Sequence, residues 1–121
     1  MAENSKKLFG QVLREKRVAR GFSLRKFAEK TGVSPTYLSQ VEQCRLDPPT
    51  AERVQRMAEL LGENADEMIG LAGRVPGDLP KIIQDRPEAM PELLRAAQGL
   101  TVEQIRALAK RARALKGESQ K

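Results

Sequence analysis

Apolar residues recur along the chain at intervals of three and four positions, the spacing that favours amphipathic helices. This spacing predicts five helices, at residues 8–20, 24–31, 35–43, 51–61 and 65–71. No segment has a convincing strand pattern. Four of the helices are preceded by short polar residues suited to an N-cap: Ser23, Ser34, Thr50 and Asn64. The sequence therefore predicts an all-α fold.

A stretch rich in glycine and proline, residues 70–78, separates these helices from the rest of the chain. We therefore expect a five-helix bundle domain at residues 1–72, a linker at 73–78 and a short helical extension at 79–117. In the extension, helices are predicted near 79–84 and 88–97. A better-defined helix follows a capping box formed by Thr101 and Gln104.

Composition narrows the range of functions. The chain has no histidine and one cysteine, so the commonest general base and the commonest metal ligand are missing. We expect neither an enzyme nor a bound metal or cofactor. No apolar run is long enough to span a bilayer and no signal peptide is evident, so we expect a cytoplasmic protein without a membrane partner. The net charge of +6 suits a polyanionic partner, although a solvated basic surface explains it equally well.

Residues 24–41 form the most informative segment, with two short predicted helices separated by a turn that contains Gly32. Glycine tolerates the positive φ that a tight interhelical turn demands. Ala28 is small enough for the two helices to cross closely, while Leu38 and Val41 would anchor the second helix on the core. This pattern is typical of a helix-turn-helix, whose second helix enters the major groove of DNA.

Three segments carry a family resemblance: Ser23–Ser34, Tyr37–Glu42 and Asp47-Pro48. Together with the predicted helix at 51–61 they closely resemble the repressor/Cro-type helix-turn-helix family, also called the XRE family, over about residues 7–72. The resemblance implies a five-helix bundle that binds operator DNA, usually as a two-fold dimer on a palindromic site. Our primary hypothesis is therefore a homodimeric transcription regulator that binds double-stranded DNA. We favour a repressor, which would occupy a palindrome that overlaps a promoter.

The resemblance places base contacts on the predicted helix at 35–43. Four polar residues share one side of that helix, and a proline lies at its tip: Thr36, Ser39, Gln40, Gln43 and Pro35. Gln40 can make the bidentate pair that suits adenine. Phosphate contacts are expected from basic and polar side chains around the motif: Ser23, Arg25 and Lys26, then Tyr37 and Arg45. The alternative is that these residues form only a solvated helix face.

Further family positions concern structure rather than recognition. The resemblance implies that Arg17 and Glu42 form an ion pair that ties the first helix to the third. Two positions depart from the family pattern: Leu24 replaces a polar residue, often glutamine, and Cys44 replaces a glycine. A left-handed backbone at Cys44 would cost about 1 kcal/mol. A tolerated small residue is the favoured interpretation of Cys44, and a redox role is the alternative.

The last predicted helix has a narrow apolar stripe suited to packing on one other helix: Ile105, Leu108, Ala112 and Leu115. The stripe either folds back on its own chain or pairs with a second copy. We favour dimerisation, because one short reading helix covers too little DNA for specificity. In a third interpretation the basic side of this helix contacts nucleic acid itself.

A rival hypothesis comes from a different class of protein. Some members of the family are antitoxin-like interaction modules that neutralise a partner protein through a segment outside the helix-turn-helix. The C-terminal third of this chain could be such a docking arm for a toxin, or the target of a regulatory protease.

Overall fold

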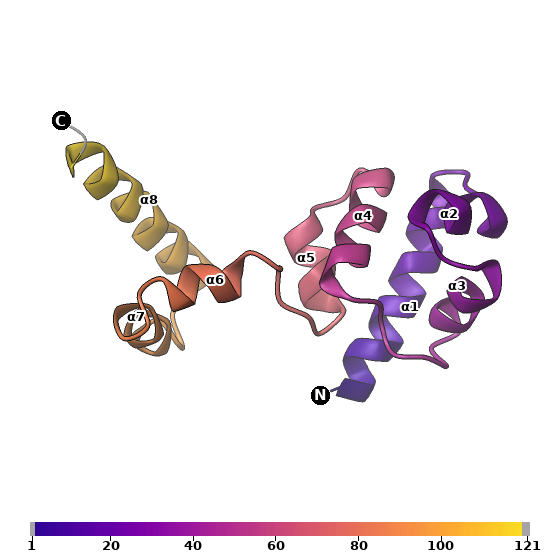
Figure 1. The fold of residues 1–121 in the computed structure, drawn as a ribbon, viewed down its shortest axis with the longest axis horizontal. Helices are drawn as coiled ribbons and strands as arrows, with labels where there is room; N and C mark the ends of the chain where they lie inside the picture. The colour runs from indigo at the N-terminus through magenta and orange to yellow at the C-terminus, as the bar shows by residue number, and fades with distance from the viewer. Residues whose placement is uncertain (1, 120–121) are drawn as a thin grey trace. The chain divides into compact units, whose positions relative to one another are not determined.

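The computed structural model describes residues 2–119, and these residues form helices and loops without any strand (Figure 1). The N-terminal helices are α1 (Ala2–Ala19), α2 (Leu24–Thr31), α3 (Pro35–Glu42), α4 (Ala51–Leu61) and α5 (Ala65–Leu71). They are followed by α6 (Leu79–Gln84), α7 (Ala89–Ala96) and α8 (Val102–Ser119). The predicted all-α class, a five-helix bundle followed by a helical extension, is confirmed.

The helix ends differ from prediction by small amounts that have physical reasons. Helix α1 begins at Ala2 rather than at residue 8, because the prediction started from the first residue of the apolar spacing, Leu8. Helix α3 ends at Glu42, and Gln43 is its C-cap. Four N-caps form as predicted, with each side-chain oxygen accepting a backbone N–H three residues later: Ser23 from Lys26, Ser34 from Tyr37, Thr50 from Arg53 and Asn64 from Glu67.

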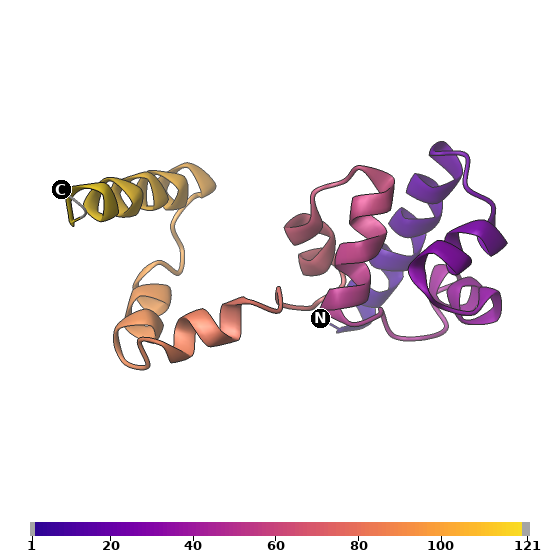
Figure 2. The same cartoon turned by 45° about the horizontal axis from the view of Figure 1, so that its top comes forward.

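The N-terminal unit, Met1–Leu79, is organised around α1. In both Figure 1 and Figure 2, α4 and α5 lie on one side of α1, and α2 and α3 lie on the other side. Helices α1 to α4 each contribute at least one fully buried side chain to a single core: Phe9, Leu13, Phe27, Leu38, Val54 and Met57 are all 0% exposed. Helix α5 adds Met68 and Ile69, which are 4% and 1% exposed. This core fixes the orientation of α2 and α3.

The chain just after α5 stays attached to the bundle. Ala72 is buried, and the Arg74 guanidinium donates from Nε to the carbonyl of Pro49 at 3.1 Å and from Nη2 to that of Pro48 at 2.5 Å. These two carbonyls belong to the loop between α3 and α4. The path of the chain is therefore set by the bundle as far as Arg74, within the segment expected to be a linker.

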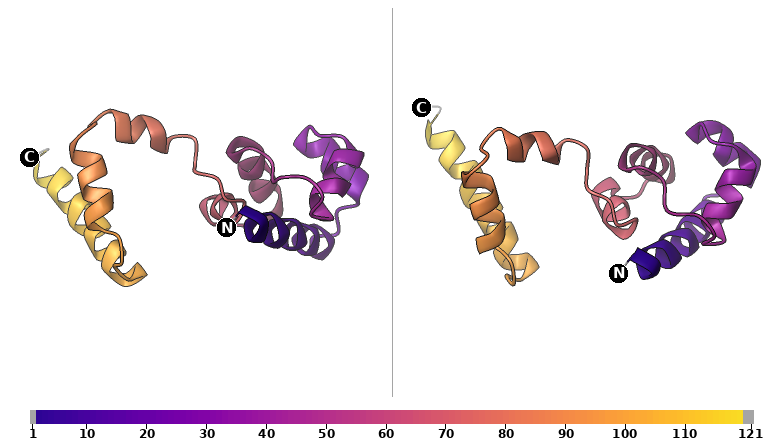
Figure 3. Two further views of the ribbon diagram at one scale, coloured as in Figure 1. Left: turned by 90° about the horizontal axis from the view of Figure 1, so that it is seen from below. Right: turned by 60° about the horizontal axis from the view of Figure 1, so that its bottom comes forward.

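The C-terminal unit, Pro80–Lys121, has a different character. Figure 3 shows α6, α7 and α8 as successive helices joined by short loops. The predicted capping box opens α8: the Thr101 N–H donates to the Gln104 side chain at 2.9 Å, and the Gln104 N–H donates to Thr101 Oγ1 at 3.1 Å. No residue from 80 to 118 is buried. The described residues of this unit therefore form no buried core of their own. The proposed boundaries at 72, 78 and 117 stay a prediction.

Candidate nucleic-acid interface

The turn between α2 and α3 is built by local hydrogen bonds. Gly32 ends α2 in the left-handed conformation, with φ of 73°. The Val33 N–H then donates to the Ala28 carbonyl at 3.0 Å, and Thr31 Oγ1 donates to the Phe27 carbonyl at 2.8 Å. Only three residues separate the two helices, and Ala28 is fully buried beneath the turn. The sequence thereby places α3 directly against α2, as a helix-turn-helix requires.

Helix α3 has a buried side and an outward side. Leu38 and Val41 are 0% and 1% exposed. The predicted base-contact residues lie on the other side, where Pro35, Thr36 and Gln43 are exposed while Ser39 and Gln40 are half-buried. The structure thus brings all five onto one surface of α3. Their contact with bases is not tested by this arrangement and stays a prediction.

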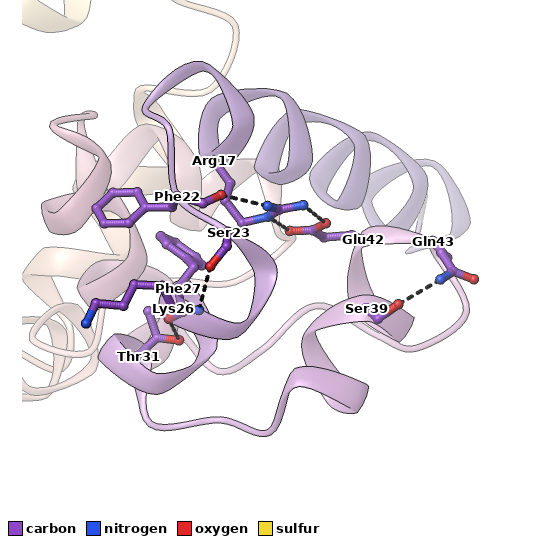
Figure 4. Close-up of polar contacts among 9 residues, drawn as sticks. All are labelled: Arg17, Phe22, Ser23, Lys26, Phe27, Thr31, Ser39, Glu42 and Gln43. Carbon is purple, nitrogen blue, oxygen red and sulfur yellow. Dashed lines mark hydrogen bonds and ion pairs between the residues drawn. The ribbon is translucent and has the colours of Figure 1, made fainter.

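A buried ion pair ties α3 to α1. Arg17 Nε lies 2.6 Å from Glu42 Oε2, and Arg17 Nη2 donates to Glu42 Oε1 at 2.9 Å (Figure 4). Arg17 Nη1 also donates to the Phe22 carbonyl at 2.8 Å, in the loop before α2. Both charged residues are buried, at 8% and 7% exposure. One guanidinium therefore joins α1, the approach to α2 and the end of α3, and it occupies both oxygens of Glu42.

Two polar residues on the outward side of α3 are bonded to each other. Gln43 Nε2 donates to Ser39 Oγ at 2.8 Å, one helical turn away (Figure 4). A cleft of about 300 Å³ adjoins them, lined by Arg14, Arg17, Leu24, Ser39, Glu42 and Gln43. The sequence placed Ser39 and Gln43 on one face, but their mutual bond was not predicted.

The predicted phosphate-contact residues come from the start of α2, the first turn of α3 and the loop after α3. Figure 4 shows the Lys26 side chain extending away from Ser39 and Gln43. Ser23, Arg25, Lys26 and Arg45 are exposed, and Tyr37 is half-buried at the start of α3. The Ser23 oxygen caps α2, so it marks the position where free amide groups of the first turn meet solvent. Exposed cations near a polar helix face are suited to contact a phosphate backbone.

Sequence reasoning missed two arginines beside this surface. Arg53, in the first turn of α4, donates from Nη1 to the Gly32 carbonyl at 3.2 Å and lines a cleft of about 400 Å³ with Ser34 and Tyr37. No local signal could have found Arg53, because it lies far from α3 in sequence and is brought there by the fold. Arg14 lies three residues before Arg17 on α1, so helical spacing from the predicted ion pair could have found it.

The two departures from the family pattern have structural accounts. Leu24 is half-buried and packs against the core cluster, so its side chain adds apolar contact at the start of α2. Cys44 follows α3 with φ of 61°, the left-handed conformation that a glycine adopts more easily. Its Sγ lies 3.9 Å from the Glu42 carbonyl.

Within residues 2–119, no group of His, Cys, Asp or Glu side chains is placed to hold a metal ion. No helix among the described residues is long and apolar enough to cross a membrane.

Comparison with known proteins gives matches to regulators of one kind. The model of a family described as a helix-turn-helix domain matches residues 8–68. Comparison with curated proteins found no match. Among solved structures, the clp gene regulator ClgR from Corynebacterium glutamicum is 26% identical over 78% of this chain and 94% of its own, with a TM-score of 0.50.

Two further solved structures match a shorter part of the chain. A transcriptional regulator of the HTH_3 family from Vibrio cholerae is 27% identical, over 58% of this chain and 39% of that chain, with a TM-score of 0.51. The biofilm master regulator SinR, solved in complex with DNA, is 28% identical over 50% of this chain and 97% of its own, with a TM-score of 0.47.

Proposed function

Because this chain belongs to the helix-turn-helix domain family and is of the repressor/Cro (XRE) type, we propose that it is a sequence-specific transcription repressor that binds a palindromic operator as a homodimer. ClgR and the Vibrio cholerae protein, which share the fold, are both described as regulators. The observation that carries the proposal is the fixed orientation of α3. Its apolar side is locked into the core, so its polar side is a defined surface for base edges.

Base recognition is assigned to the outward side of α3. Gln40 offers a donor and an acceptor that match adenine N7 and N6, and Thr36 offers a hydroxyl and a methyl group. Pro35 supplies an apolar contact at the tip of the helix, while Ser39 and Gln43 extend the same surface toward its C-terminal end. These contacts choose the sequence.

Affinity is assigned mainly to phosphate contacts around this surface. The contributing side chains are those predicted from the sequence, together with the arginine found in the structure: Ser23, Arg25, Lys26, Tyr37, Arg45 and Arg53. Each cation that neutralises a phosphate releases bound counterions, so affinity falls steeply as salt rises. Binding across a promoter would then repress by steric exclusion.

Dimerisation is assigned to α8. Its stripe of Ile105, Leu108, Ala112 and Leu115 is exposed within the chain, and the three large side chains are 46%, 45% and 47% exposed. A stripe two residues wide per heptad suits a single partner helix. Pairing of two copies would place two α3 helices on one face of DNA, about 34 Å apart.

Selection of binding sites from random duplex DNA tests recognition. We expect an inverted repeat with half-sites about one helical turn apart. Gln40→Ala should then lose about 1–3 kcal/mol of binding free energy on the selected site, measured by fluorescence anisotropy. The matched control is Gln55→Ala, which removes an exposed glutamine from α4 and should leave affinity unchanged. No enriched sequence, with equal weak binding to all DNA, would refute sequence-specific recognition.

Sedimentation velocity tests the dimer. Leu108→Lys places a charge in the apolar stripe and should shift the protein toward monomer and weaken binding to the full palindrome. Ala107→Lys adds the same charge beside the stripe and should leave both unchanged. A wild-type protein that stays monomeric while filling the full operator would contradict dimerisation through α8.

A second candidate function is the antitoxin-like interaction module. It is favoured by the exposed apolar side chains of residues 80–118, which a toxin or another protein partner could cover instead of a second copy. Failure of the DNA selection, combined with a monomeric wild type, would make this the leading hypothesis.

A further inference from the structure

Ser39 and Gln43 are joined by two hydrogen bonds. The Gln43 side chain donates from Nε2 to Ser39 Oγ at 2.8 Å, and the Gln43 backbone N–H donates to the Ser39 carbonyl at 3.0 Å. Gln43 is exposed, and an exposed glutamine normally rotates among several rotamers. Here the amide is held by a partner one turn earlier on the same helix, as Figure 4 shows. The side chain is therefore pre-oriented before any ligand arrives.

We propose that Ser39 determines specificity by positioning Gln43, so that Gln43 reads adenine and rejects guanine at one base pair of each half-site. This inference rests on the proposed function, because it assumes that α3 lies in the major groove. It specifies which of the two purines Gln43 selects, whereas the proposed function assigns base recognition to α3 without that choice.

The hydrogen-bonding groups of an amide limit which purine Gln43 can bind. A glutamine side chain has two N–H donors and one carbonyl acceptor. Adenine presents one acceptor and one donor in the major groove, N7 and the N6 amino group, whereas guanine presents two acceptors, N7 and O6. With one N–H engaged by Ser39, Gln43 keeps one donor and one acceptor. That set matches adenine, whereas guanine would leave two acceptor oxygens facing each other.

Two side chains close to the pair, Glu42 and Leu24, do not compete for this bond. The nearest carboxylate on α3, Glu42, has both oxygens engaged by Arg17, so it does not compete for the Gln43 amide. Leu24, which lines the same cleft, offers no side-chain donor or acceptor. Ser39 Oγ is the acceptor of Gln43 Nε2 in the structure.

The test compares purine preference in four full-length proteins: wild type, Ser39→Ala, Ser39→Thr and Gln43→Ala. Gln43→Ala identifies the base pair that Gln43 reads: it is the operator position at which this variant loses the purine preference that the wild type shows. At that base pair we expect the wild type to bind adenine on the order of tenfold tighter than guanine. Ser39→Ala should reduce this ratio to about twofold, because the freed amide can rotate so that its NH2 group, rather than its oxygen, faces guanine O6. Ser39→Thr keeps the hydroxyl and should restore the ratio.

The outcomes separate a positioning role from a structural one. A merely structural role of Ser39 would weaken binding to all sites equally and leave the adenine-to-guanine ratio unchanged, which would overturn the inference. A wild-type preference for guanine that is lost in Ser39→Ala would also overturn it. Such a preference would mean that Gln43 of the wild type faces the base with its donors rather than with one donor and one acceptor. If wild type selects no sequence at all, the proposed function fails and this inference fails with it. An unchanged ratio on a well-selected operator sinks the inference alone.

Discussion

The two units of the chain use apolar residues in opposite ways. In the N-terminal unit, Phe27 and Leu38 are fully buried, whereas in the C-terminal unit Leu93, Ile105 and Leu108 are 51%, 46% and 45% exposed. A close-packed core holds side chains in single rotamers, so the outer face of each core helix is defined by its inner face. The outward surface of α3 is therefore defined by its own chain, whereas the large apolar side chains of the C-terminal unit remain exposed within theirs.

One charged pair from each unit shows the same difference in burial. Arg17 and Glu42 have side chains only 10% and 5% exposed and form a bidentate pair. In the C-terminal unit, Lys81 lies 3.3 Å from Asp85 with both side chains more than half exposed. Solvent screens the second pair but not the first. Position relative to the core thus decides how much any interaction contributes to stability.

Truncation of an apolar side chain should give the largest contrast between the units. Phe27→Ala removes a fully buried ring and should lower the free energy of unfolding by about 3–5 kcal/mol. Leu108→Ala removes a half-exposed side chain and should change it by less than about 0.5 kcal/mol. Urea unfolding followed by the fluorescence of Tyr37, the only tyrosine, reports on the bundle. Equal losses would show that Leu108 is part of the bundle core.

Removal of one charge tests the ion pairs. Arg17→Met leaves Glu42 buried without its partner and should cost about 3–5 kcal/mol of folding free energy. The double variant Arg17→Met/Glu42→Leu should recover most of that loss, because no unpaired charge remains. Lys81→Met breaks the exposed pair and should change stability by less than about 0.5 kcal/mol. A double variant as unstable as the single one would contradict this account.

Glycine-to-alanine substitutions should have opposite signs in the two units. A Cβ on Gly10 would lie 2.4 Å from the Val41 carbonyl oxygen, so Gly10→Ala must push α1 away from α3 and should cost about 1–3 kcal/mol. A Cβ on Gly117 meets nothing within 4 Å, so Gly117→Ala should stabilise α8 by up to about 1 kcal/mol. Thermal unfolding measured by circular dichroism checks the first, and helix content checks the second. A neutral Gly10→Ala would show that the two helices are not closely packed.

Much of the fold could be predicted because its determinants are local. Apolar spacing, the N-caps and the glycine after α2 all act within a few residues, and each is visible in the sequence. Burial of Leu38 and Val41 then follows from the period of the helix, and with it the outward face of α3. This is why the candidate reading surface could be proposed without a structure.

The parts that could not be predicted depend on contacts between distant segments or on a choice among rotamers. Arg53 reaches Gly32 from another helix, and Arg74 reaches Pro48 from beyond α5. The close approach at Gly10 depends on how α1 crosses α3. Spacing placed Ser39 and Gln43 on one face, but several rotamers of Gln43 would satisfy that spacing without their bond.

The smallest expected effect concerns an exposed ion pair within the N-terminal unit. Lys16 hydrogen-bonds Glu63, and this bond, followed by the negative charge of Glu63, raises the pKa of Lys16 above its ordinary 10.5. Because the pKa is higher in the folded state, the pair's contribution to stability is fully present below pH 10.5. It is lost as the pH rises through the folded-state pKa.

The variant that tests this pair is Lys16→Gln. Its melting temperature should lie slightly below that of the wild type at neutral pH, and the difference should shrink once the pH exceeds the raised pKa. The control, Lys110→Gln, removes an exposed lysine from α8 and should show no such pH-dependent difference. A Lys16→Gln difference that stays constant across this pH range would mean that the lysine stabilises the bundle through the packing of its aliphatic stem rather than through its charge.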